Sequence, residues 1–183
     1  DHVITMHVSM TGDAWTDARR AAFVDDLTTR TAALPGVVKA GVVSSLPIDG
    51  SSWYSVFSAQ DKPAPPRDQL PSAAITLATP SYFDAIGIRL LRGRTFTAAD
   101  RDGSGLVIVI NESLARRIWP GEDAVGKRIK RGFPDQPGEW REVVGVVSTR
   151  TIAEREALIG RLMGRALAHE LGHYLLETKE HRA

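Results

Sequence analysis

The sequence predicts a folded domain of mixed α and β structure, followed by a separate helix at its C-terminal end. The chain has 183 residues, which corresponds to about one domain and a fraction. Hydrophobic residues make up 43% and charged residues 25%, which is ordinary for a folded domain and argues against disorder. Strand-like and helix-like patterns follow each other through the first 148 residues, and a helical pattern resumes after residue 149.

The first elements form one compact α/β unit. Residues 3–10 are apolar with partial alternation, which predicts a strand. Residues 17–34 place apolar side chains on one helical face and charged ones on the rest, which predicts a helix. The Pro-Gly pair at 35–36 ends this helix, because proline cannot continue it and glycine suits its cap. Residues 37–46 predict a second strand, which completes a strand–helix–strand unit.

The remaining elements are shorter and are separated by loops rich in proline and glycine. Strands are indicated by alternating or continuous apolar stretches, and helices by start signals such as Pro80 and the cap residue Asn111. The expected strands are 53–59, 73–78, 106–110, 127–131 and 140–147, and the expected short helices are 81–86 and 112–119.

Two of these strands carry further expectations. The continuous apolar run at 106–110 predicts a strand that is buried on both faces. The segments 127–131 and 140–147 predict a hairpin. Because 127–131 is rich in lysine and arginine, we expect it to be a solvated edge strand, where lysine discourages further pairing. A binding site for lipid headgroups is the alternative interpretation of this basic run. Trp53, Trp119 and Trp140 are expected in the core or at the domain edge.

Composition excludes several classes of function. The formal net charge is +1, so no electrostatic reason favours nucleic acid or an anionic membrane as the partner. The chain has no cysteine, which excludes disulfides, thiolate zinc sites and cysteine nucleophiles. No basic and apolar leader opens the sequence, and no apolar run approaches the roughly 20 residues of a membrane helix. We therefore expect the chain to be a piece of a longer protein.

A series of short motifs carries a family resemblance. In chain order they are 33–37 (ALPGV), 43–47 (VSSLP), 79–88 (TPSYFDAIGI), 91–96 (LRGRTF), 109–117 (VINESLARR), 119–123 (WPGED), 126–129 (GKRI) and 142–147 (EVVGVV). In this order and spacing, residues 1–148 resemble the MacB-like periplasmic core domain of ABC-transporter permeases, a group that includes FtsX-like proteins.

The resemblance implies an α+β fold with a mixed sheet, on the periplasmic face of the cell membrane and between two membrane helices that this chain lacks. It also implies a non-catalytic role, in which the domain transmits motion and contacts other transporter subunits or periplasmic proteins, with no nucleic acid and no cofactor. The residues agree with that expectation. The stretch 8–168 contains no histidine, and its serines and carboxylates have no base at the spacing of a nucleophilic site.

The last part of the chain carries a different motif. Three of the five histidines fall in the last fifteen residues, and His169 and His173 belong to an H-E-x-x-H sequence on a predicted helix. Residues four apart project from one helical face, so the two imidazoles could hold one Zn²⁺. Glu170 would then polarise the metal-bound water as general base, and His181 is the candidate third ligand.

Residues 160–183 resemble the active-site helix of zincin metallopeptidases, with His181 in place of the metzincin third ligand, where position 179 is Lys. The resemblance makes a zinc-dependent peptidase fragment the alternative function. The competing interpretation is an amphipathic helix whose polar residues match the pattern by chance. The sequence therefore predicts two parts, a periplasmic core domain at 1–148 and a helical tail at 149–183.

Overall fold

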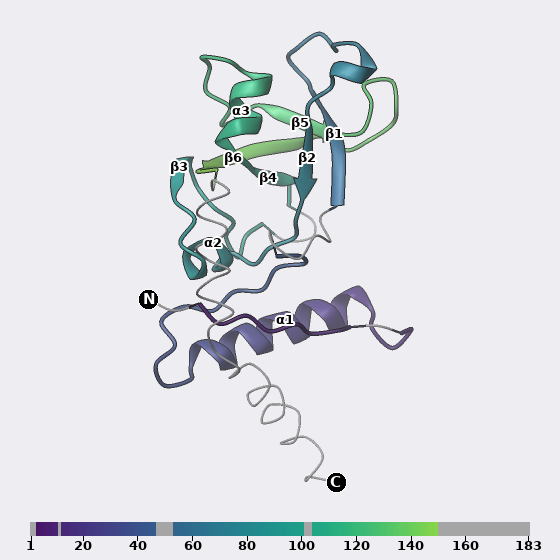
Figure 1. Ribbon diagram of the computed structural model, residues 1–183. Helices are drawn as coiled ribbons and strands as arrows, with labels where there is room; N and C mark the ends of the chain where they lie inside the picture. The colour runs from purple at the N-terminus through teal and green to yellow at the C-terminus, as the bar shows by residue number, and fades with distance from the viewer. Residues whose placement is uncertain (1–2, 11, 47–52, 101–103, 150–183) are drawn as a thin grey trace. The chain divides into compact units, whose positions relative to one another are not determined.

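The computed structural model describes residues 3–10, 12–46, 53–100 and 104–149, drawn in colour in Figure 1. The chain divides into two compact units, of which the first includes Asp1–Arg30 and the second is Thr31–Arg150. The predicted tail at 149–183 lies, from residue 150 onward, outside the described residues. Within the described ranges, no helix is long and apolar enough to cross a membrane.

The first unit contains most of the predicted long helix. Helix α1 spans Asp17–Ala32, two residues less than the sequence predicts. Ion pairs one turn apart, Asp17 with Arg20 and Asp26 with Arg30, support its exposed surface. The strand predicted at 3–10 is wrong, because this segment forms no ladder with any described residue. An alternating pattern predicts an extended segment, whereas a strand also requires a partner.

The second unit is built on a mixed sheet, which confirms the predicted α+β class. Its strands run in the order β2-β1-β5-β6-β3, and β4 also pairs with β6. The bounds are β1 Trp53–Ala59, β2 Ser72–Ile75, β3 Leu90–Gly93, β4 Val107–Asn111, β5 Arg128–Arg131 and β6 Arg141–Val147. The β4–β6 pairing is parallel, and the other pairings of the described strands are antiparallel.

Strand β6 is the centre of this sheet. Strand β4 pairs with it from Glu142 to Val147 and so occupies one of its two edges. Its other edge is divided, because β5 pairs with Arg141 and Glu142 while β3 pairs with Gly145 to Val147. One strand therefore joins three others, and the expected hairpin of 127–131 with 140–147 is confirmed.

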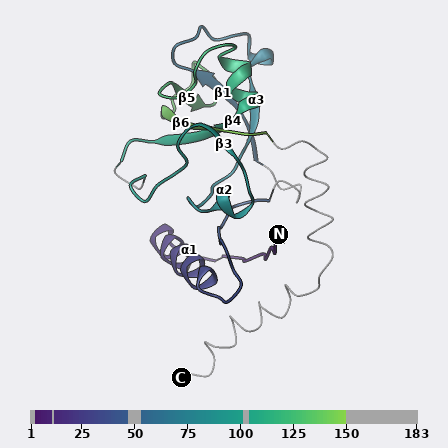
Figure 2. The same ribbon diagram turned by 90° about the vertical axis from the view of Figure 1, so that its left-hand side faces the viewer.

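Short helices flank the sheet. Helix α3 spans Glu112–Ile118, and α2 spans Tyr82–Ala85, while Arg67–Gln69 form a 3₁₀ turn. The predicted cap is confirmed, since the Asn111 side-chain oxygen accepts a hydrogen bond of 2.8 Å from the backbone N–H of Leu114. Figures 1 and 2 show α3 and α2 at opposite ends of this unit, with β4 and β6 between them.

The core lies between α3 and the sheet. Its most deeply buried side chains are Ile129 of β5, Val143 of β6 and Trp119, which follows α3 directly. Phe57, Ile110 and Leu114 pack in the same cluster. Apolar burial of this kind is the main source of stability for a small domain.

Three expectations about strands are corrected. Residues 37–46 form no strand, and only Val43 bridges to Ala78. The run at 106–110 is not buried on both faces, because β4 pairs only with β6 among the described strands and only Ile110 is buried. The basic segment 127–131 is not a solvated edge. Strand β5 lies between β1 and β6, and Lys130 is only 7% exposed, with its ammonium donating to the carbonyls of Pro134 and Gln136.

Two glycines allow the chain to pass close to β6. Gly93 of β3 is paired with Gly145 of β6 and has a φ of 69°, in the left-handed region. A Cβ at Gly93 would lie 2.2 Å from the Val144 carbonyl oxygen, and one at Gly145 would lie 2.0 Å from the Arg94 carbonyl oxygen. Neither position accepts a side chain without displacing backbone.

Candidate functional site

The predicted zinc residues His169, Glu170, His173 and His181 lie outside the described residues, and their roles stay predictions. Within the described ranges, no group of three or more His, Asp or Glu side chains is gathered so that it could hold a metal ion. The polar organisation of the described part lies elsewhere, at the end of α3.

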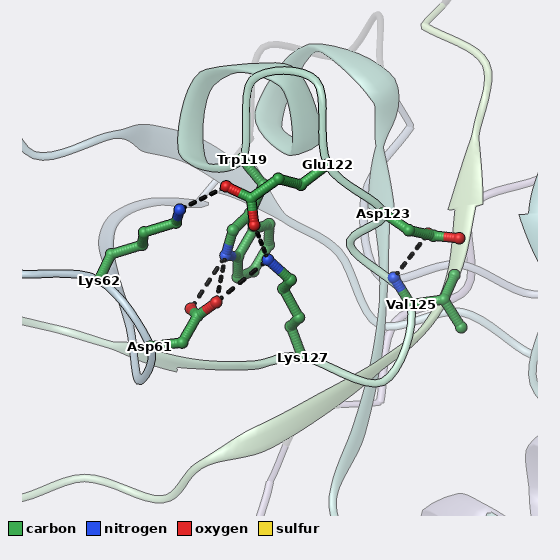
Figure 3. Close-up of polar contacts among 7 residues, drawn as sticks. All are labelled: Asp61, Lys62, Trp119, Glu122, Asp123, Val125 and Lys127. Atoms are coloured by element: carbon green, nitrogen blue, oxygen red, sulfur yellow. Dashed lines mark hydrogen bonds and ion pairs between the residues drawn. The ribbon is translucent and has the colours of Figure 1, made fainter.

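Charged side chains gather around the buried indole of Trp119. We call Asp61, Lys62, Trp119, Glu122 and Lys127 the Trp119 cluster (Figure 3). Its members come from three places in the chain: Asp61 and Lys62 follow β1, Trp119 and Glu122 follow α3, and Lys127 precedes β5. The cluster therefore connects the ends of a helix and two strands.

Trp119 is the anchor of the cluster because it is only 1% exposed and its indole N–H must be satisfied. The N–H donates to both carboxylate oxygens of Asp61, at 2.9 and 3.2 Å. The Lys127 ammonium lies 3.1 Å from an Asp61 oxygen and 5.4 Å from the centre of the indole ring. It also pairs with Glu122, whose second oxygen accepts from Lys62.

The pKa values of the cluster reflect these contacts. Partial burial opposes ionisation of Asp61, but hydrogen bonds from Trp119 and Lys127 outweigh it, so the pKa of Asp61 lies below its ordinary value. Hydrogen bonds from Lys127 and then Lys62 lower the pKa of Glu122. The hydrogen bond to Glu122 raises the pKa of Lys127. All three groups are held in their charged forms, which suits a structural joint better than a proton-transferring site.

Backbone hydrogen bonds tie this cluster to the central strand. The N–H of Gly126 donates to the Val143 carbonyl at 2.8 Å, and the N–H of Val143 donates to the Lys127 carbonyl at 2.8 Å. A second contact holds the far end of β6. The Ser113 and Thr149 hydroxyls are 2.9 Å apart, and the N–H of Thr149 donates to Glu112 at 3.3 Å. We call these contacts of Thr149 with α3 the Thr149 latch.

Trp119 is buried, which confirms its predicted place in the core or at the domain edge. No sequence pattern points to Asp61, Glu122 and Lys127 as partners of the indole. Asp61 stands 58 positions before Trp119, so no local spacing connects them. The other two expected aromatics differ, because Trp53 is 71% exposed and Trp140 is half-buried.

The sequence matches the family described as MacB-like periplasmic core domain over residues 2–168. The chain belongs to this family. It is therefore a periplasmic domain of the MacB/FtsX-like ABC-transporter permease type, on the periplasmic face of the cell membrane. The match extends past the boundary at residue 148 predicted from the sequence, and that boundary stays a prediction.

One curated relative is the macrolide export ATP-binding/permease protein MacB of Aggregatibacter actinomycetemcomitans, which is 36% identical over 74 residues. That alignment covers 39% of this chain and 10% of the relative. The chain thus spans a small part of the length of this relative.

Solved structures show weaker similarity. The periplasmic region of MacB from Actinobacillus actinomycetemcomitans has 23% sequence identity and a TM-score of 0.47, over 68% of this chain and 50% of that one. The extracellular domain of the noncanonic ABC-type transporter YknZ from Gram-positive bacteria has 20% identity and a TM-score of 0.38, over 56% and 52% of the two chains.

Proposed function

We propose that this domain is the non-catalytic part of an ABC-transporter permease that passes movement between the membrane segments and periplasmic partners. The observation that carries the proposal is the position of β6. This strand joins β3, β4 and β5, and residue 149 follows it almost directly. A displacement applied at the C-terminal side of the domain therefore reaches the centre of the sheet first.

The contacts at both ends of β6 support the same role. The Thr149 latch ties the exit of the strand to the first turn of α3. The Trp119 cluster ties the end of α3 to the end of β1 and the start of β5. A pull on residue 149 is thus shared between helix and sheet, since packed elements move as units rather than deform continuously.

The test removes the hydroxyl contacts of the Thr149 latch without changing a core residue. In the parent permease, the double variant S113A and T149V is expected to lower the amount of substrate transported per ATP hydrolysed, while the periplasmic domain keeps its melting temperature. The matched control is Ser72→Ala, an exposed hydroxyl on β2, which is expected to leave coupling unchanged. Unchanged coupling in the folded latch variant would contradict the proposal.

The partners that we propose are the other subunits of the transporter and periplasmic proteins, with membrane contact through flanking helices. Reading the DNA on both sides of this coding segment tests the last point. We expect it to encode membrane helices, and their absence from the same reading frame would contradict the proposal.

A second candidate function rests on the H-E-x-x-H sequence at His169–His173, with His181 as third ligand and Glu170 as base. Under this hypothesis the purified chain binds about one Zn²⁺, and Glu170→Gln abolishes peptide cleavage while zinc remains bound. The matched control is Glu177→Gln, a glutamate outside the motif. A chain without stoichiometric zinc, or cleavage that survives Glu170→Gln, rejects the peptidase.

A further inference from the structure

The end of β1 opposite the Trp119 cluster has an open cavity of about 380 Å³. Its walls are mostly apolar and include Trp53, Ile75, Leu77 and Ile108, together with the buried side chains of Phe57 and Ile129. Trp53 and Leu77 are 71% and 74% exposed, so large apolar side chains face solvent at its rim. The volume falls within the range of about 300–1,000 Å³ that is typical of small-molecule sites.

The cavity lies on one face of the sheet, as the strand register shows. Trp53 and Phe57 are four residues apart on β1 and therefore share a face. Trp53 is directly opposite Ile75 on β2, and Phe57 is directly opposite Arg131 on β5. Arg141 of β6 is opposite Ile129, two residues from Arg131 on β5, so both arginines belong to this face.

The two arginines give the cavity a positive rim. Diagonal neighbours in an antiparallel pair have Cα atoms about 7–8 Å apart, so both guanidinium groups are within reach of one small anion. The Arg131 guanidinium lies 5.6 Å from the centre of the Trp53 ring and forms no ion pair with any described carboxylate. The Arg141 guanidinium donates to the Glu139 carbonyl at 3.2 Å and pairs at 3.5 Å with the Glu139 carboxylate, which is mostly exposed. The described walls of the cavity contain no acidic side chain.

We propose that this cavity binds a small molecule with an apolar body and a single carboxylate, in the manner of a medium-chain fatty acid. The body would pack on Trp53 and Leu77, and Arg131 and Arg141 would donate to the carboxylate. Arginine suits this role because its planar fork matches a carboxylate and is weakly hydrated. A neutral molecule would leave the charge of Arg131 without a carboxylate partner, and a cation would be repelled.

The test is calorimetric titration of the full 183-residue chain with decanoate below its micelle concentration. Decanol and decyltrimethylammonium carry the same chain with no charge or a positive charge, and each is expected to bind at least about tenfold more weakly. Equal affinity for the three probes would overturn the proposal. Decyl phosphate that binds tenfold more tightly than decanoate would overturn the carboxylate assignment.

Variants locate the site. Arg131→Gln and Arg141→Gln are each expected to weaken decanoate binding about tenfold. Neither substitution is expected to lower the urea unfolding midpoint or to increase aggregation. Arg128→Gln is the matched control. Arg128 lies on β5 with Arg131, but it is an odd number of residues from Arg131, so its side chain lies on the opposite face of the sheet. Loss of binding in Arg128→Gln equal to that in Arg131→Gln, or no loss in any arginine variant, would overturn the proposal. Trp53→Ala is expected to weaken decanoate and decanol alike.

Discussion

Two tryptophans lie near opposite ends of β1 and differ in their burial. Trp119, whose indole contacts Asp61 just past the end of the strand, is 1% exposed and surrounded by charges in fixed pairs. Trp53, the first residue of the strand, is 71% exposed and lies beside an arginine with no described carboxylate partner. The end near Trp119 has the features of a structural joint, whereas the end at Trp53 has the features of an exposed ligand-binding surface.

The difference lies in what covers the sheet. At the Trp119 end, the end of α3 and the turn that follows it close over the apolar face, and each buried polar group has a partner. At the Trp53 end, the same kind of apolar face ends in a cavity. Apolar area exposed in this way stabilises nothing until something binds to it, which is why exposed apolar patches indicate interaction sites.

Truncating the two tryptophans gives the largest expected contrast. Trp119→Ala is expected to lower the free energy of unfolding by about 3–5 kcal/mol, because it empties a buried site. Trp53→Ala is expected to change it by no more than about 0.5 kcal/mol, because the side chain is exposed. Urea unfolding followed by circular dichroism measures both. If Trp119→Ala does not fold, Trp119→Phe keeps most of the side-chain volume and gives a smaller loss in the free energy of unfolding that can be measured. Equal losses at positions 119 and 53 would contradict the difference described between the two tryptophans.

Removing the acceptor of the indole N–H tests the charged part of the joint. Asp61→Ala leaves the Trp119 N–H without its partner, and an unpaired buried donor costs about 1–3 kcal/mol. Asp68→Ala removes an exposed carboxylate of the 3₁₀ turn and is the matched control, with an expected change within about 0.5 kcal/mol. The comparison uses the same urea unfolding measurement. Identical midpoints for the two variants would show that the hydrogen bond contributes nothing.

Low pH is expected to weaken the stabilising contacts of the Trp119 cluster. The folded pKa values of Asp61 and Glu122 lie below their ordinary values of 3.8 and 4.5, so the unfolded chain binds more protons in this region. The stability from their ionisation is therefore present at neutral pH and is lost as the pH falls below these ordinary values. Urea midpoints measured against pH are expected to fall less steeply for the D61N and E122Q double variant.

Asp100 retains part of the acid dependence in that double variant, because hydrogen bonds from Arg94 and Thr97 hold its pKa far below the ordinary value. An unchanged pH profile for the double variant would contradict the role given to the cluster.

The smallest expected effect is a difference in urea midpoint between variants of the two lysines of the Trp119 cluster. Lys62→Met removes one exposed ion pair with Glu122, and surface pairs contribute little. Lys127→Met removes contacts with Asp61, Glu122 and the indole ring from a side chain that is only 23% exposed. The urea midpoint is expected to move less for Lys62→Met than for Lys127→Met, and the reverse order would contradict this description.

Local patterns predicted the elements whose signals are contained in a few residues. Neighbouring side chains are enough to predict the cap at Asn111, the helix that begins at Asp17, and the pairing of 127–131 with 140–147. The edge position predicted for 127–131 failed because β1, which pairs with β5, lies some seventy residues earlier in the chain. A separation of 58 positions likewise hides the contact of Asp61 with Trp119 from any local pattern. Pairing that depends on strand order has no local signature either.

The position of β6 has a consequence for the order in which the domain is made. This strand is the last of the described strands in the chain, yet β3 and β4 pair with it and with no other described strand. Until Arg141, the first residue of β6, has been synthesised and delivered to the periplasm, only the β1–β2 and β1–β5 pairings of the described strands can form. The apolar side chains of β4 and α3 stay without their sheet during that interval, when exposed apolar surface invites aggregation. The arrival of β6 ends that interval, because β3 and β4 then gain the one described strand with which both of them pair.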